Sequence, residues 1–252
     1  MSIRVRNLAF DYKDFRLRVA DLGFERSRLT AIVGPNGAGK TTFLKCLGSL
    51  LPISAGAVMV DDRDLVRFKN RERARRIGFV PQEHGSVFNY TVLDFVLLGR
   101  AAHLSVFATP AADDERLARE ALNYVGLEAF AERPIAQLSS GERRLALIAR
   151  ALAQATEILL MDEPTTFLDM KHEVEILELV RRLAREAGKT VVCTLHNLDM
   201  ALKYADAMVF MKAGAVLAAG PPDAVLSEAL LEKVYDIPIR IRAVDGRRVL
   251  LR

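Results

Sequence analysis

The chain has 252 residues, of which 51% are apolar and 27% are charged, and its net charge is +4. These values fit a compact protein with a large core, built as one domain or as one and a half. The charged N-terminal stretch is unlike a signal peptide, and no apolar run approaches the roughly 18 residues of a membrane-spanning helix. We therefore expect that the chain itself does not cross a membrane.

Strand-like runs alternate with helical stretches along most of the sequence. The segments 2–12 and 16–24 have the alternating pattern of a half-exposed sheet. Apolar strands are predicted at positions 29–34, 76–81, 157–162, 190–195 and 207–212. The range 83–156 has helical spacing and lacks such strands. This order predicts an α/β fold with a mainly parallel sheet, helices on both faces, and an inserted helical part.

A glycine-rich turn follows the first apolar strand, with the sequence AIVGPNGAGKTT at positions 31–42. Gly34 to Thr41 fits the phosphate-loop pattern G-x-x-x-x-G-K-[ST] between a strand and a helix. A plain glycine-rich turn is the alternative, but it does not require a lysine followed by a threonine. Backbone N–H groups would cradle the β- and γ-phosphates, Lys40 would add a positive charge, and Thr41 would place its hydroxyl on Mg²⁺. The predicted nucleotide-binding residues are Gly34, Pro35, Asn36, Gly37, Ala38, Gly39, Lys40, Thr41 and Thr42.

Two further features of the first part of the chain have mainly structural interpretations. Cys46 and Cys193 lie in apolar stretches and are expected to be small buried hydrophobes, so neither a disulfide nor a zinc site is indicated. Positive charge is concentrated at positions 67–76. A solvated amphipathic helix is the favoured interpretation, and a patch for nucleic acid or lipid headgroups is the alternative. Aromatic residues are nearly absent there, which disfavours single-stranded nucleic acid.

A serine-rich turn, LSSGE at positions 138–142, opens a predicted helix. Ser139 or Ser140 would be a suitable N-cap for a helix with an acidic first turn. A helix N-terminus that carries hydroxyl groups is also an anion site, and it would be the second one in this chain.

Two adjacent carboxylates, Asp162 and Glu163, end the apolar strand at 157–162. Taken alone, the pair could cap a helix that starts at Pro164. In a chain with a phosphate loop, Asp162 would instead hold Mg²⁺, and Glu163 would point at the water that attacks the γ-phosphate. This combination predicts ATP hydrolysis.

A histidine, His196, follows the next apolar strand. A lone histidine among apolar residues is usually structural. The carboxyl ends of the strands of an open α/β sheet, however, face the crevice where ligands bind. We therefore interpret His196 as a site residue.

The order of these motifs resembles that of ATP-binding cassette ATPases, and the resemblance covers nearly the whole chain. It implies that Gln82 senses Mg²⁺ and the membrane partner, that His196 contacts the γ-phosphate, and that Asp169 lies at a dimer interface. Tyr12 resembles the aromatic residue that stacks on adenine, with Phe10 and Phe15 as competitors. The turn at 138–142 resembles the family signature, which implies that Ser139, Ser140, Gly141 and Glu142 bind ATP. Ser140 stands where the signature commonly has glycine.

The resemblance also implies the organisation of the chain. We expect a RecA-like P-loop NTPase core at about 1–82 and 157–252, with an N-terminal antiparallel β-subdomain. A helical subdomain at about 83–156 would be inserted into this core. The cofactors would be ATP and Mg²⁺, and two chains would enclose two ATP molecules as a homodimer.

Several stretches, including TVLDFVLLGRAAHL and the tail VLSEALLEKVYDIPIRI, resemble ATPase subunits of type II importers for iron-siderophore, haem, cobalamin and, in some members, molybdate. The resemblance implies two membrane-spanning permease subunits, indirectly a substrate-binding protein, and a peripheral place on the cytoplasmic face of the membrane. Positions 85–104 have two equally favoured interpretations. They would form a surface that receives a helix of the permease, or they would fill the core of the helical subdomain. The alternatives are a soluble ATPase of iron-sulfur cluster assembly and a nucleic-acid-associated ATPase. No nucleic acid is expected, because such cassettes generally carry a second cassette or a long coiled-coil insertion.

Overall fold

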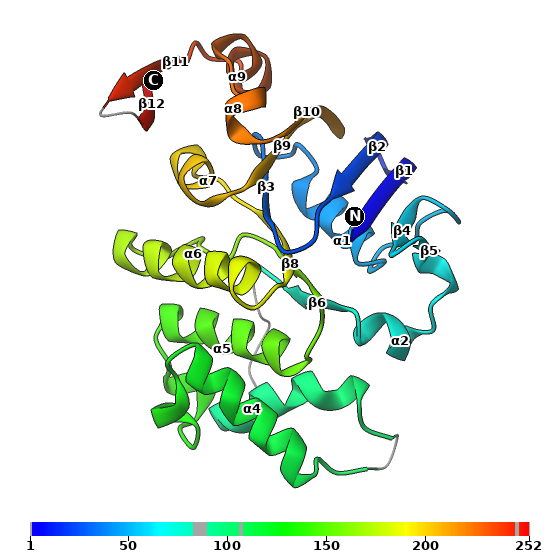
Figure 1. Ribbon diagram of the computed structural model, residues 1–252, viewed down its shortest axis with the longest axis vertical. Helices are drawn as coiled ribbons and strands as arrows, with labels where there is room; N and C mark the ends of the chain where they lie inside the picture. The colour runs from blue at the N-terminus through cyan, green and yellow to red at the C-terminus, as the bar shows by residue number, and fades with distance from the viewer. Residues whose placement is uncertain (1, 83–89, 106–107, 245–246, 252) are drawn as a thin grey trace.

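The computed structural model describes residues 2–82, 90–105, 108–244 and 247–251. Its main feature is a curled sheet of ten strands, in the order β5-β4-β1-β2-β10-β9-β3-β8-β7-β6, with helices packed against it (Figure 1). The predicted α/β class is confirmed. A separate two-stranded sheet lies close to the C-terminus.

The centre of the sheet consists of parallel strands in the order β9, β3, β8, β7 and β6. Their bounds are Leu29–Val33 for β3, Ile77–Val80 for β6, Ile158–Met161 for β7, Thr190–Thr194 for β8 and Ala207–Lys212 for β9. All residues of β3, β7 and β8 are buried, because helices cover both faces. All five strands were predicted from the sequence.

Two clusters of buried side chains lie on opposite faces of these strands. In one cluster helix α1 (Lys40–Leu47) packs between the central strands and the N-terminal strands. In the other cluster the opposite face contacts α6 (Met170–Arg185), α7 (Leu198–Tyr204) and the helices that precede β7. Cys46 and Cys193 are both free and buried, as predicted, and burial raises the pKa of the Cys193 thiol to about 12.

The N-terminal strands β1 (Ile3–Tyr12) and β2 (Phe15–Phe24) form an antiparallel pair, which confirms the sequence prediction. Three strands that pair with their neighbours in the same sheet were not predicted. They are β4 (Val58–Val60), β5 (Arg63–Asp64) and β10 (Ala215–Gly220). Two of them are very short, and the third, AVLAAG, has no alternation of polar and apolar residues, so none has a strong strand pattern in the sequence.

Helices fill the described part of the chain between β6 and β7, as predicted, and form the lower part of the molecule in Figure 1. Their bounds are α3 (Val92–Leu97), η2 (Leu98–Ala102), α4 (Ala112–Tyr124), η3 (Glu128–Phe130), η4 (Ile135–Gln137) and α5 (Ser140–Ala153). Helix α5 lies nearest the sheet and contacts β6. Residues 83–89 and 106–107 of this range lie outside the described residues.

The remaining elements are short. The segment before β6 holds η1 (Leu65–Arg67) and α2 (Asn70–Ala74), which has no buried residue and therefore agrees with a solvated basic surface. After β10 the chain forms α8 (Pro222–Val225), α9 (Glu228–Tyr235) and the hairpin of β11 (Arg240–Val244) with β12 (Arg247–Leu251).

Among the described residues, none of the helices combines the length and apolar character needed to cross a bilayer.

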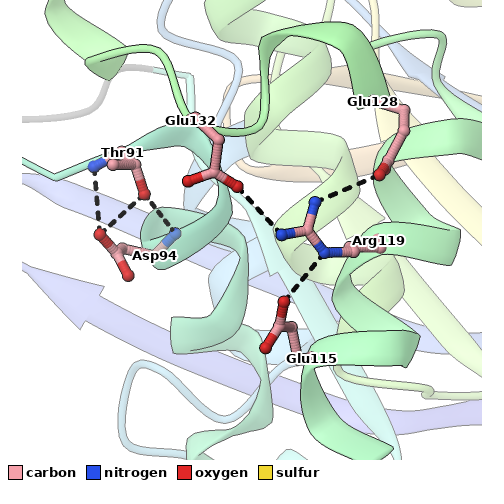
Figure 2. A network of polar contacts seen from close by, with 6 residues as sticks. All are labelled: Thr91, Asp94, Glu115, Arg119, Glu128 and Glu132. Atoms are coloured by element: carbon pink, nitrogen blue, oxygen red, sulfur yellow. Dashed lines mark hydrogen bonds and ion pairs between the residues drawn. The ribbon is translucent and has the colours of Figure 1, made fainter. Parts of the chain in front are cut away.

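Two arginines of the helical part contrast in burial. The Arg100 side chain is only 8% exposed, and its Nε lies 2.9 Å from Oδ1 of Asp114, while its Nη1 donates to the Ala153 carbonyl at 2.7 Å. Arg119 is 37% exposed and donates to three carboxylates on the surface, those of Glu115, Glu128 and Glu132 (Figure 2). Figure 2 also shows the Thr91–Asp94 capping box that starts α3.

We expect Arg100→Met to lower the free energy of unfolding by about 3–5 kcal/mol, because it leaves the buried Asp114 carboxylate without its cation. Arg119→Met, the matched control, should cost about 1 kcal/mol or less, since its partners are solvated. Urea unfolding of both variants measures the difference. Equal losses for the two variants would contradict the assignment of Arg100 as a buried anchor.

Candidate functional site

The glycine-rich turn joins β3 to α1 at the carboxyl end of the central strands. Gly34, Gly37 and Gly39 have φ values of +153°, +78° and +94°. A Cβ atom at Gly34 would lie 2.1 Å from the Met211 carbonyl oxygen, and one at Gly39 would lie 2.4 Å from Cζ of Phe15. The backbone contact at Gly34 and the positive φ at Gly39 therefore favour glycine, which keeps the backbone of the turn close to its neighbours.

Lys40 starts α1 and lies over the turn. Its Nζ donates to the carbonyls of Gly34 at 2.8 Å and Pro35 at 3.1 Å. Burial lowers the pKa of Lys40, while Glu163 and Asp162 oppose this shift. A pocket of about 260 Å³ opens beside it, lined by Phe15, Asn36, Gly37, Gly39, Lys40, Thr41, Thr42 and Glu163. The phosphate loop and the second acidic residue thus share one pocket.

Asp162 and Glu163 follow β7 and are both buried. Oδ1 of Asp162 accepts hydrogen bonds from the Thr41 hydroxyl at 3.0 Å and from the Thr194 hydroxyl at 2.8 Å. The alternative that this pair caps a helix at Pro164 is wrong. The next helix, α6, begins at Met170, and its N-cap is Asp169.

The Glu163 carboxylate lies among three polar side chains. Oε2 accepts from Nε2 of Gln82 and from the Thr166 hydroxyl, the latter at 3.0 Å, and Oε1 contacts Nε2 of His196. Gln82 follows β6 and His196 follows β8, the two strands on either side of β7. The three residues predicted as catalytic are therefore brought together.

The serine-rich turn at 138–142 does not line the phosphate-loop pocket. Ser139 is the N-cap of α5 and forms a capping box with Glu142, with bonds of 2.8 and 3.2 Å. The Ser139 N–H and hydroxyl lower the pKa of Glu142. Ser140 lines a different pocket, of about 220 Å³, together with Gln82, Arg143, Arg144, Leu147 and the segment 166–168.

Asp169 lies beside the same turn. Its Oδ1 accepts from the His172 N–H at 2.9 Å and lies 2.8 Å from Nδ1 of His172. A Cβ atom at Gly141 would lie 3.1 Å from Cδ2 of His172. The site residues thus form two groups within one chain: the phosphate-loop group, and a group of the serine-rich turn and Asp169.

The three candidates for adenine stacking lie in different surroundings. Tyr12 is 61% exposed, and Nζ of Lys13 lies 5.6 Å from the centre of its ring. Phe15 packs on Gly39 and lines the phosphate-loop pocket. Phe10 is partly buried against the core on the α1 side of the sheet.

The segment 85–104 is mostly a core element in its described part. Val92, Leu93, Phe95 and Val96 are buried, whereas Leu98 is 46% exposed. Most apolar residues in the described part of this segment therefore fill the core of the helical part, which was one of the two interpretations of the sequence. Leu98 is available to a partner.

Some contacts of the site were not predicted from the sequence. Thr194 and Thr166 bond to the acidic pair, and Arg144 donates to the carbonyls of Pro81 at 2.9 Å and Gln82 at 2.6 Å. Thr194 is the last residue of an apolar strand, two positions before His196, but this position does not identify it as a partner of the acidic pair. Arg144 had no signal either, since it lies on a charged helix with several arginines.

The sequence profile of the family described as ABC transporter matches residues 17–166 of this chain. The hemin import ATP-binding protein HmuV of Rhodococcus jostii is 42% identical over 223 residues, which cover 87% of this chain and 75% of that protein. The iron(3+)-hydroxamate import ATP-binding protein FhuC of Bacillus subtilis is 36% identical over 242 residues, which cover 95% of this chain and 90% of that protein.

Solved structures have the same fold. An inward-facing ABC transporter described as of the metal-chelate type matches with a TM-score of 0.86 and 30% identity, covering 99% of this chain and 95% of that one. An ATP-binding cassette, solved as a dimer in a post-hydrolysis state with ADP and Pi, matches with a TM-score of 0.74 and 29% identity, covering 87% of this chain and 98% of that one. The chain therefore belongs to the ABC transporter family, as an ATP-binding cassette that hydrolyses ATP.

Proposed function

We propose that this cassette powers the import of an iron chelate, such as a siderophore complex or haem, or of cobalamin, through two separate permease subunits. The proposal rests on the import functions for which its relatives are named and on the motif order. It places the chain on the cytoplasmic face of the membrane as a peripheral subunit, with a substrate-binding protein as an indirect partner. The cluster of Gln82, Glu163 and His196 beside the phosphate loop is the observation that supports ATP hydrolysis as its chemistry.

The donor set fits Mg²⁺ held between protein and phosphate. The Thr41 hydroxyl oxygen lies 3.0 Å from Oδ1 of Asp162. The Gln82 amide contacts the carboxylate of the next residue, Glu163. Mg²⁺ prefers oxygen ligands and commonly uses one or two carboxylates together with substrate phosphates. The described residues contain no group of three or more His, Cys, Asp or Glu side chains that could hold a metal ion alone. When bound, the ion would neutralise charge on the phosphates.

The other site residues take separate roles in this proposal. The phosphate loop from Gly34 to Thr42 binds the phosphates through its N–H groups and Lys40. Tyr12 offers an exposed ring to adenine, while Phe15 supports Gly39. Glu163 orients the attacking water and accepts its proton. Gln82 and His196 hold the Glu163 carboxylate and face the γ-phosphate.

The two groups of site residues suggest that a second chain completes each site. We place the core at about 1–82 and 157–252 and the helical subdomain at about 83–156. The turn from Ser139 to Glu142 and Asp169 would then serve the ATP held by the partner's phosphate loop. An isologous homodimer gives two equivalent sites of this kind.

Co-purification tests the import proposal directly. The tagged chain should be isolated in detergent with a protein that contains several membrane-spanning helices. Recovery with soluble scaffold proteins instead would favour iron-sulfur cluster assembly. Steeply salt-dependent binding of DNA or RNA would favour a nucleic-acid-associated ATPase.

Glu163→Gln should slow ATP hydrolysis by about 10²–10⁴-fold, because it removes the group that accepts the proton of water. ATP binding should persist, so the ATP-bound dimer should accumulate. Steady-state phosphate release and size-exclusion chromatography measure the two effects. Glu157→Gln, at the opposite end of the same strand, is the matched control. Near-normal turnover of Glu163→Gln would refute the assignment.

Ser139→Arg should leave ATP binding by the monomer intact but abolish ATP-driven dimerisation and hydrolysis, because the bulky side chain blocks closure on the partner. Mixing this variant with Lys40→Ala gives a sharper test. If lysine and serine act across the interface, the mixed dimer has both lesions in one site and an intact second site. Hydrolysis should then reappear in the mixture. Continued inactivity of mixed dimers that demonstrably form would count against the shared site.

Leu98→Glu should uncouple substrate uptake from ATP hydrolysis, because a charge would disfavour an apolar contact with the permease. Basal ATPase activity should stay within about twofold of wild type, since Leu98 is exposed. Val249→Glu, in the C-terminal hairpin, is the control and should leave uptake unchanged. Uptake into vesicles that contain the co-purified permease measures the effect. Full uptake by the Leu98 variant would remove this position from the permease surface.

A further inference from the structure

One buried hydroxyl connects the two acidic residues of the site. The Thr194 side chain donates to Oδ1 of Asp162 at 2.8 Å and accepts from the Glu163 N–H at 2.8 Å, and its exposed fraction is 0%. We propose that Thr194 is a positioning residue for ATP hydrolysis, which fixes where Glu163 presents its carboxylate. This inference rests on the role proposed above for Glu163.

The pairing of two strands places this hydroxyl. In the parallel pair of β7 and β8, Ile158 lies opposite Thr190 and Met161 lies opposite Cys193. The next step along both strands brings Thr194 opposite Asp162. Because the strands are fully buried and packed from both faces, this register is rigidly fixed.

Glu163 is the residue that needs such support. It has a φ of +46°, a left-handed backbone conformation that costs free energy for a residue other than glycine. The peptide N–H at this strained position is buried and donates to the Thr194 hydroxyl. The left-handed turn directs the chain away from the strand axis. The Glu163 side chain meets Gln82, Thr166 and His196 there.

The hydrogen-bonding capacity of Thr194 argues for positioning rather than direct chemistry. A hydroxyl has a single proton, and the Thr194 proton is directed at Asp162. One of its lone pairs is occupied by the Glu163 N–H. Thr194 also does not line the phosphate-loop pocket, whereas Glu163 and Thr41 do. Its effect on the reaction must therefore pass through Asp162 and Glu163.

The test uses Thr194→Val, which keeps the branched shape and removes the hydroxyl. We expect kcat for ATP hydrolysis to fall about 10²-fold, the scale of effect that a small misplacement of a catalytic group produces. The Kd for ATP should change less than about threefold, because the phosphate loop is untouched. Thr194→Ser should restore kcat to within about fivefold of wild type. Thr190→Val, which removes a buried hydroxyl from the other end of β8, is the matched control and should keep full kcat.

A double-mutant cycle separates positioning from a general structural role. If Thr194 acts through Glu163, Thr194→Val should lower kcat much less in a Glu163→Gln background than in wild type. Losses that multiply in the double variant would overturn the inference, and so would a Thr194→Val variant with normal kcat. Loss of ATP binding together with kcat, without rescue by serine, would also overturn it, because it indicates a fold defect.

The roles of Glu163 and Thr194 can be refuted separately. Normal turnover of Glu163→Gln would overturn the proposed role of Glu163. A strong defect in Glu163→Gln combined with normal turnover of Thr194→Val would overturn only the positioning role of Thr194.

Discussion

The hydrogen bond from Thr41 to Asp162 joins two segments that are 121 positions apart in the chain. It can form only because β3, β8 and β7 run parallel and end at the same edge of the sheet. The register of β3 with β8, and of β8 with β7, then decides which side chains emerge together at that edge. A slip of one residue in either pair would turn the opposite face of the strand toward the site.

The buried position of the acidic pair follows from this arrangement. Asp162 and Glu163 leave a strand whose residues are all buried, so their polar atoms need partners within the protein. Hydroxyls from α1 and β8 satisfy Asp162, and Gln82, Thr166 and His196 surround the Glu163 carboxylate. The left-handed conformation of Glu163 costs free energy, which the buried contacts of this residue offset.

The parts of the site that the sequence predicts are those encoded by local chemistry. The phosphate loop needs glycines and a lysine at fixed spacing, and the acidic pair and His196 follow apolar strands. Which side chains contact Glu163 directly depends instead on the order and register of the strands, which residue patterns alone do not specify. Thr194 resembles any threonine of a buried strand until β8 is placed next to β7.

The predictability of the fold likewise differs from one element to another. Long apolar strands and helices with clear periodicity were predictable, whereas β4 and β5 are too short to have a period. The hairpin of β11 and β12 was not predicted, although Ile239 and Ile241 alternate with Arg240 and Arg242 as in a half-exposed strand. The core role of positions 92–96 could not be separated from a docking surface, because apolar helical spacing serves both.

The two groups of site residues are physically connected through helix α5. Its first turn is capped by Ser139, and Arg144, on the same helix, donates to the carbonyls of Pro81 and Gln82. Gln82 in turn contacts Glu163. A displacement of the Gln82 backbone would therefore break two bonds to a charged donor or shift α5 together with the serine-rich turn. Because α5 is a single rigid element, it can move as a whole and keep both hydrogen bonds of Arg144, which favours a shift of the helix over breaking these bonds. This contact provides a physical route by which one nucleotide site could affect the turn proposed to serve the other.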